Sequence, residues 1–234
     1  MVIQHNIAAI NSYRNLGINQ SGLNKNLEKL SSGYRINRAG DDAAGLAISE
    51  SMRSQINGLN QATKNAQDAV GLIQTVEGAL TETHSMLQRL TTLASQSANG
   101  TYNSVARGNL QLEVKQLLSE IDRIANYTDF NGIKPIANNV GMGKMTFQIG
   151  PSAKETILVD KQAMTASFLG LGQKTVNQLG RTDTKWAKST IGGDIDVSKQ
   201  SGGNFAIDRI NDAINLVSQY RAGLGAAQNR LEHT

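Results

Sequence analysis

Residues 41–99 read DDAAGLAISESMRSQINGLNQATKNAQDAVGLIQTVEGALTETHSMLQRLTTLASQSAN, and this stretch decides the fold. Apolar and small side chains recur in steps of four and three residues, which keeps one stripe on one face of a helix. A helix of about 50 residues would be roughly 75 Å long. A compact single domain does not need such a helix, so other segments must be its partners. The stripe runs through Met52, Ile56, Leu59, Thr63, Ala66, Val70 and Ile73 and resumes at Val76, Leu80, Thr83, Leu87, Leu90 and Ala94.

Both ends of this helix carry signals, and its middle carries one irregularity. Asp41 and Asp42 stand where carboxylates accept hydrogen bonds from free backbone N–H groups at a helix start. Asn99-Gly100 is a typical helix end. Two successive three-residue steps within residues 70–76 predict a local slip of the heptad.

An amphipathic helix is also predicted over residues 1–31. Its apolar steps of three and four residues are interrupted only by glycines at 17 and 22, which weaken a helix. Because an isolated helix of this kind is marginal in water, we expect it to become ordered only against a partner helix. The stripe comprises Ile3, Ile7, Ile10, Tyr13, Leu16, Gln20, Leu23, Leu27 and Leu30.

Two more helices follow the long one. The segment 104–128 has its stripe at Leu110, Val114, Leu117, Ile121 and Ile124, and its short connection predicts antiparallel packing on the long helix. The segment 204–234 restores the pattern, with Arg221 and Gln228 at two inward positions. This last pattern is still running at Thr234, from which we expect a truncated chain. Its apolar members are Ile207, Ile210, Ile214, Val217, Leu224 and Leu231.

Between these helices the period changes to two. Met145, Phe147 and Ile149 alternate with polar residues, and a Gly150-Pro151 turn separates them from the run 156–159. This pattern predicts a β-hairpin within residues 140–160. Residues 161–203 are rich in Gly, Ser and Thr, and either a peripheral lobe or ordered loops would fit them.

Composition excludes several classes of function. The 234-residue chain has no cysteine, so disulfides and thiolate zinc sites are excluded. Its three histidines, His5, His84 and His233, are scattered without ligand spacing, and we predict no catalytic residues, no cofactor and no metal site. The net charge of +4 is dispersed, which disfavours nucleic acid as a partner. No apolar run is long enough to span a membrane, and the first helix lacks the basic face of a membrane-surface helix.

The segment LSSGYRINRAGDDAAGLAI at residues 30–48 closely resembles the N-terminal signature of bacterial flagellin. The segment GLGAAQNRLEHT at residues 223–234 resembles the returning helix of the same family. The resemblance implies a mainly α fold, an elongated antiparallel bundle of long helices with a β-hairpin and a small irregular lobe. It also implies four parts: an inner-layer helix and linker (1–40), rod helices and hairpin (41–160), a short variable lobe (161–203) and a returning rod helix (204–234).

The function implied by this resemblance is structural. The chain would be a subunit of the flagellar filament, a homopolymer used for motility, whose terminal helices fold as they assemble. It would be exported by the flagellar export apparatus without a cleaved signal peptide and would be extracellular. The family continues beyond the motif that ends at Thr234, so a C-terminal helical segment is expected to be missing. The assembly helix would bury Ile3, Ile7, Ile10, Leu23, Leu27 and Leu30.

The resemblance further implies recognition by the Toll-like receptor that detects flagellin. The expected patch comprises Gln88, Arg89, Leu93, Gln96 and Glu113, with an arginine fork, an apolar neighbour and a carboxylate. Thr91 and Thr92 replace residues that are commonly basic and acidic in the family, which predicts weakened but not abolished binding. A solvated face that binds neighbouring subunits is the competing interpretation. For the whole chain, a flagellar hook–filament junction protein and a non-polymerising helical adaptor or receptor ligand are the alternatives.

Overall fold

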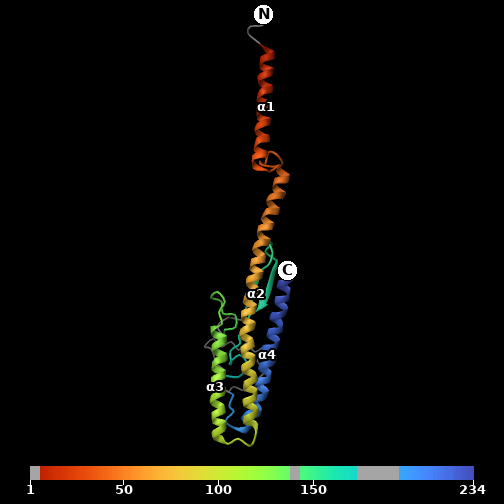
Figure 1. Ribbon diagram of the computed structural model, residues 1–234. Helices are drawn as coiled ribbons and strands as arrows, with labels where there is room; N and C mark the ends of the chain where they lie inside the picture. The colour runs from red at the N-terminus through yellow and green to blue at the C-terminus, as the bar shows by residue number, and fades with distance from the viewer. Residues whose placement is uncertain (1–5, 138–142, 173–194) are drawn as a thin grey trace, which may run out of the picture. The chain divides into compact units, whose positions relative to one another are not determined.

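The computed structural model describes residues 6–137, 143–172 and 195–234 (Figure 1). The expected fold class is confirmed: the chain is mainly α-helical, with long packed helices and one antiparallel hairpin. It divides into two compact units, Met1–Asn60 and Gln61–Thr234, which are described separately. In chain order the elements are α1 (Ile7–Ser32), α2 (Ala43–Ala98), α3 (Ser104–Tyr127), β1 (Lys144–Gln148), β2 (Thr156–Asp160) and α4 (Gln200–Glu232).

In the first unit, α1 has standard caps at both ends and an uncovered surface. The side chain of Asn6 accepts a hydrogen bond from the N–H of Ala9 at 3.1 Å. Gly33 takes a left-handed conformation (φ 72°) and donates its N–H to the carbonyl of Lys29, which closes the helix. None of the residues of α1 is buried.

The two adjacent aspartates have different roles. Asp42 accepts the N–H of Gly45 at 2.9 Å and therefore caps α2, as expected. The carboxylate of Asp41 instead accepts the N–H groups of Asn37 and Arg38, at 3.2 and 3.3 Å. The expectation that both residues cap the helix is wrong for Asp41, which orders the linker between α1 and α2.

In the second unit, the buried face of α2 follows an uninterrupted heptad. Ala69, Ile73, Val76 and Leu80 are buried in steps of four and three, so the predicted slip does not occur. The prediction failed because it placed the larger Val70 in the stripe, whereas the structure buries the smaller Ala69 and leaves Val70 only partly covered. Thr83 is also buried and donates its hydroxyl to the carbonyl of Ala79 at 3.0 Å.

Both α3 and α4 pack antiparallel against α2, along different sides of it (Figure 1). Arg107 near the start of α3 bonds to the carbonyls of Ser97 and Asn99 at the end of α2, each at 2.9 Å. Gly203 near the start of α4 lies directly on the α2 backbone, where an added Cβ would be 2.7 Å from the nitrogen of Ala98. Towards the other end of α4, Arg221 pairs with Glu77 at 3.4 Å.

The buried stripe of α4 differs in part from the predicted one. Ile207, Ile214, Arg221 and Gln228 form a flanking column that is only partly buried. The buried stripe also contains Tyr220 and several small residues between the large apolar residues that were predicted. The small residues fit there because helices that approach closely favour small side chains at the contact. The stripe comprises Gly203, Ala206, Ile210, Ala213, Val217, Tyr220, Leu224, Ala227 and Leu231.

The predicted hairpin is present as an antiparallel pair of five-residue strands. The register places Met145 opposite Val159 and Phe147 opposite Ile157, and these side chains form its covered face. The hydroxyl of Tyr220 donates to the carbonyl of Asp160 at 3.1 Å, which ties α4 to β2. Part of the predicted range, including Val140, lies outside the described residues.

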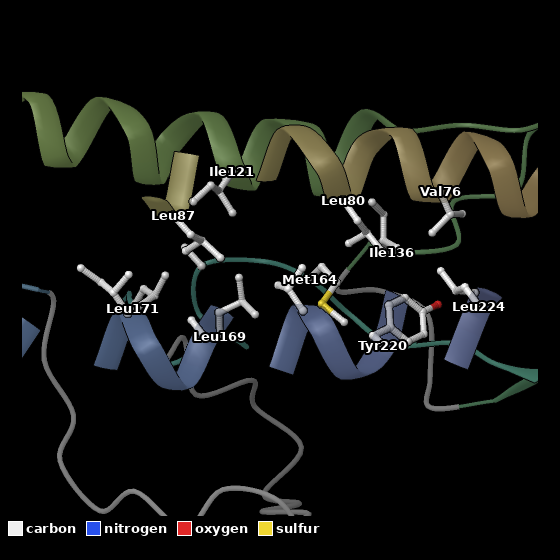
Figure 2. Close-up of a cluster of buried hydrophobic side chains, with 14 of the residues drawn as sticks. Val76, Leu80, Leu87, Ile121, Ile136, Met164, Leu169, Leu171, Tyr220 and Leu224 are labelled. Atoms are coloured by element: carbon white, nitrogen blue, oxygen red, sulfur yellow. The ribbon is translucent and has the colours of Figure 1, made fainter. Parts of the chain in front are cut away.

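Coil segments complete the core of the second unit. Met164, Leu169 and Leu171 gather with side chains of α2, α3 and α4 in one apolar cluster (Figure 2). Gln111 of α3 holds the returning coil by donating to the carbonyl of Ile195 at 3.0 Å and accepting the N–H of Val197 at 2.6 Å. The described parts of 161–203 are therefore core-filling loops and not a peripheral lobe, while residues 173–194, with Trp186, lie outside the described residues.

Candidate assembly and recognition surfaces

The predicted assembly residues on α1 that the structure describes are all exposed, and we name them together the assembly face. Ile3 lies outside the described residues. The other five have 52–80% of their surface exposed, although each is a large aliphatic side chain. Ile7 and Ile10 are neighbours on the helix surface, and so are Leu23, Leu27 and Leu30, and an exposed apolar patch of this kind marks an interaction site in a soluble protein. The assembly face comprises Ile7, Ile10, Leu23, Leu27 and Leu30.

The first part of α2, also in the first unit, is similarly uncovered. Ile48, Met52, Ile56 and Leu59 are 51–57% exposed, although the last three belong to the stripe predicted to be buried. The expectation of burial is therefore wrong for these three residues and for Thr63, which is also exposed, and it holds for every stripe member from Ile73 onwards. Both helices of the first unit present apolar residues at helical spacing that need a partner.

The second surface, which we name the Arg89 patch, lies in the second unit where α2 and α3 meet. The Nε and Nη2 atoms of Arg89 are both 2.7 Å from Oε1 of Glu113. The side chains remain 50% and 41% exposed, so the pair is fixed and still accessible from solvent. The structure thus brings together the two charged residues that the sequence placed in one site.

The other predicted members of the patch behave differently from one another. Gln88 is exposed, with its amide nitrogen 3.1 Å from Nε2 of His84, and Gln96 is half-buried. Leu93 has no exposed surface and belongs to the core of the second unit. Leu112 of α3, next to Glu113 in the chain, is 63% exposed and was missed because it lies off the α3 stripe.

Among the described residues of the two units, groups that could bind a metal ion are not gathered at one place. Within residues 6–137, 143–172 and 195–234, no cluster of three or more His, Cys, Asp or Glu could hold a metal ion. No described helix is long and apolar enough to cross a membrane. The pKa of Tyr220 is raised to about 12 because burial penalises its charged form, but the hydroxyl is bonded to backbone and not to another titratable side chain.

Comparison with known proteins finds relatives along the whole chain. The bacterial flagellin N-terminal helical region matches residues 3–140. The chain is 46% identical to the flagellin of Bacillus subtilis strain 168, over the whole chain and 81% of that protein. It is 44% identical to the flagellar filament 30.7 kDa core protein of Treponema maltophilum, over 99% of the chain and 79% of that protein.

A solved structure extends the likeness to the fold. The crystal structure of Bacillus cereus flagellin superimposes with a TM-score of 0.57 at 26% sequence identity, covering 73% of this chain and 86% of that one. These matches are to filament proteins, and they favour neither a hook–filament junction protein nor a non-polymerising adaptor. The chain belongs to the bacterial flagellins, which are structural, non-enzymatic subunits of the flagellar filament.

Proposed function

We propose that the assembly face of α1 is the surface through which this chain joins the inner layer of the filament. The polymer itself follows from membership of the flagellins, and the proposal concerns the residues that hold it together. The exposure of all five described residues supports it. Fully burying one such aliphatic side chain contributes about 1.5–3 kcal/mol, so burying all five in the polymer would favour assembly.

The flagellin family also implies a role for each part of the chain, which we include in the proposal. Residues 1–40 form the inner-layer helix and linker, 41–160 and 204–234 the rod, and 161–203 the short variable region between them. The chain passes through the flagellar export apparatus without a cleaved signal peptide before it reaches the filament. A second terminal helix covers the assembly face in the polymer. The expectation that a C-terminal segment is missing stays a prediction; the relatives compared above are longer than this chain.

We further propose that the Arg89 patch binds the flagellin-sensing Toll-like receptor. The observation that carries this proposal is the Arg89–Glu113 pair, in which two guanidinium nitrogens converge on one carboxylate oxygen. Glu113 fixes the rotamer of a long side chain before binding, which lowers the entropy lost on association. The unpaired edge of the guanidinium remains available as a hydrogen-bond donor, and arginine is enriched at interface hot spots.

The exposure of the neighbouring side chains decides which other residues we include in the Arg89 patch. Because Leu93 is buried in the free chain, we leave it out of the proposed contact. Leu112 supplies the exposed apolar surface beside Glu113, and Gln88 adds an exposed amide. Thr91 and Thr92 stand where resembling flagellins commonly have charged residues, so binding by this chain is weaker than theirs.

The test is the affinity of the chain for the receptor ectodomain, measured by surface plasmon resonance. Arg89→Ala should weaken binding about 30-fold, the effect of removing a hot-spot residue of roughly 2 kcal/mol. Arg123→Ala is the matched control, because Arg123 also pairs with an exposed glutamate on α3, Glu120, but outside the patch. Thr92→Glu should strengthen binding. Equal losses for the Arg89 and Arg123 variants would remove the Arg89 patch as the receptor site.

A further inference from the structure

The chain contains three Asn-Gly pairs, and the structure gives each a different environment. They are Asn57-Gly58, Asn99-Gly100 and Asn131-Gly132. Asn-Gly is the dipeptide most prone to spontaneous deamidation, because glycine leaves its own backbone nitrogen unhindered. If the local sequence alone decided the rate, the three pairs would react alike. The hydrogen bonds around them differ in a way that separates them.

The reaction needs a nucleophilic backbone nitrogen and an electrophilic side-chain carbon. The glycine N–H loses its proton, and the nitrogen attacks Cγ of the preceding asparagine. The new C–N bond closes a succinimide ring, and the side-chain amide leaves as ammonia. Water then opens either ring carbonyl, giving aspartate or isoaspartate. One water is consumed, one ammonia is released, and no other reactant is required.

The turn between α2 and α3 arranges Asn99-Gly100 for this attack. The side-chain oxygen of Asn99 accepts the N–H of Thr101 at 3.2 Å. This bond closes an Asx-type ring that contains the Gly100 nitrogen, and it polarises the side-chain carbonyl that is to be attacked. Within the described part of the chain, the N–H of Gly100 has no hydrogen-bond acceptor. The nucleophile is therefore unhindered and its target is held on the same side.

A cation next to this peptide increases its reactivity. The Nη2 atom of Arg107 donates to the carbonyl oxygen of Asn99 at 2.9 Å, and its Nε donates to that of Ser97. The Asn99 carbonyl belongs to the same peptide group as the Gly100 nitrogen. When that nitrogen loses its proton, the negative charge is shared with this oxygen, where the guanidinium stabilises it through a charge-assisted bond.

We propose that Asn99 is a site of spontaneous deamidation in the folded chain, promoted by Arg107 and producing aspartate and isoaspartate at position 99. In the isoaspartyl product the former backbone carbonyl becomes a free carboxylate beside Arg107, so the product is also electrostatically favoured there. The extra backbone methylene lies in the turn that places α3 on α2.

A neighbouring negative charge protects Asn131 from deamidation. The N–H of Gly132 donates to the carboxylate of Asp129 at 3.1 Å, so removing its proton would place a negative charge against an anion. Asn131 itself is held at a positive φ of 51° by a tight turn, with Phe130 and Ile133 exchanging two backbone hydrogen bonds. Gly58 lies inside α2, where helical hydrogen bonds engage the backbone N–H groups.

The experiment is a time course at mildly alkaline pH, followed by tryptic peptide mapping with mass spectrometry that distinguishes isoaspartate. The three asparagines fall on separate peptides, Ser54–Lys64, Leu90–Arg107 and Ile124–Lys144, since trypsin does not cleave between Lys134 and Pro135. In the folded chain Asn99 should react about tenfold faster than Asn57 or Asn131, the effect of one charge-assisted hydrogen bond. In denaturant the three rates should converge. Equal rates in the folded chain, or a faster Asn57 or Asn131, would overturn the proposal.

Variants separate the role of Arg107 from a general loosening of the turn. Arg107→Gln should slow Asn99 about tenfold in the folded chain and leave its rate in denaturant unchanged. Arg107→Lys should restore most of the folded-state rate, because it keeps the positive charge. If Arg107→Gln merely loosened the turn, the deamidation rate at Asn99 in the folded chain would approach the rate in denaturant. Lysine at position 107 would then not restore the parent rate. That result would remove Arg107 from the mechanism.

A second variant tests the same electrostatic rule at the protected site. Asp129→Ala removes the anion from the Gly132 N–H and should raise the rate at Asn131 about tenfold without changing the rate at Asn99. Thermal unfolding followed by circular dichroism checks that all three variants remain folded at the incubation temperature. An unchanged rate at Asn131 would mean that the carboxylate does not control the reaction, which contradicts the explanation given for Asn99.

Discussion

Tyr220 is the buried side chain whose ionisation bears most directly on stability. It packs in the α4 stripe with 7% of its surface exposed and donates its hydroxyl to the hairpin. Burial raises the pKa of Tyr220 from 10.0 to about 12. The phenol of Tyr220 therefore stays neutral up to a higher pH in the folded chain than in the unfolded chain.

The free energy of unfolding should therefore fall as the pH rises above 10. Below pH 10 the phenol is neutral in both states, so its contribution to stability is fully present. Between pH 10 and 12 the unfolded chain loses the proton and the folded one keeps it, so the free energy of unfolding falls by about 2–3 kcal/mol. Chemical denaturation at several pH values should show this loss in the parent chain and a smaller one in Tyr220→Phe. Tyr13→Phe, at an exposed position, is the control; identical slopes for the parent and Tyr220→Phe would contradict the assignment.

Asp41 gives a prediction in the acid range. The N–H groups of Asn37 and then Arg38 donate to its carboxylate, which lowers the pKa of Asp41 below 3.8. The order that it gives the linker is present above pH 3.8 and is lost as the pH falls through the lower, folded pKa. Amide hydrogen exchange should show protection of Asn37 and Arg38 that Asp41→Asn reduces. Asp42→Asn, which affects only the α2 cap, should leave both amides unchanged; loss of their protection in that variant would argue against the separate roles.

Single residues also mark the limit of what could be predicted from the sequence. Two adjacent aspartates before a helix both look like caps, and only the path of the linker separates Asp41 from Asp42. Leu93 lies next to the stripe member Ala94, and it is buried because neighbouring elements cover α2 on more than one side near that end. Periodicity identifies one buried face, whereas the width of that face depends on how many neighbours surround the helix.

Among the elements, the contact between α4 and α2 depends most on a small residue. Gly203 allows the two backbones to approach, because an added Cβ would stand 2.7 Å from the nitrogen of Ala98 and 3.1 Å from the oxygen of Ala94. Both of these atoms are backbone and cannot rotate away. The close approach explains why α4 begins on the end of α2 with no side-chain cap of its own.

Gly203→Ala should therefore destabilise the second unit by about 1–3 kcal/mol through overpacking, although alanine is the better helix former. Gly223→Ala is the matched control on the same helix, since its added Cβ meets nothing within 4 Å. That control should stabilise by about 0.5–1 kcal/mol. Thermal or chemical denaturation of the two variants measures both effects; stabilisation by both would mean that the helices are not in close contact at Gly203.

The helices and the hairpin could be predicted from the sequence because each repeats a pattern, with period 3.5 in α2 and two in β1 and β2. The coil that completes the core has no period. Met164, Leu169 and Leu171 look like isolated apolar residues in a polar segment, yet all three are buried. Polar anchors such as Gln111, which holds Ile195 and Val197, act between segments more than 80 residues apart and leave no local signal.

For the whole molecule, the distribution of apolar side chains separates two kinds of surface. In the second unit the stripes of α2, α3 and α4 are buried within the chain. In the first unit α1 buries nothing, and the residues of its stripe are all exposed. Since flagellins form the filament, the uncovered stripe is the part of this chain that assembly can bury, and the Arg89 patch belongs to the part that is already folded.

The central claim is that the assembly face on α1 holds the subunit in the filament. Electron microscopy of cells in which this chain is the only flagellin tests it with two variants, Leu23→Asp in the assembly face and Ser21→Asp, which lies about 200° around the helix from Leu23. Measuring the chain in the medium separates export from assembly. If the parent chain and Ser21→Asp form filaments while Leu23→Asp is exported but forms none, the claim is supported. Normal filaments from Leu23→Asp would contradict it.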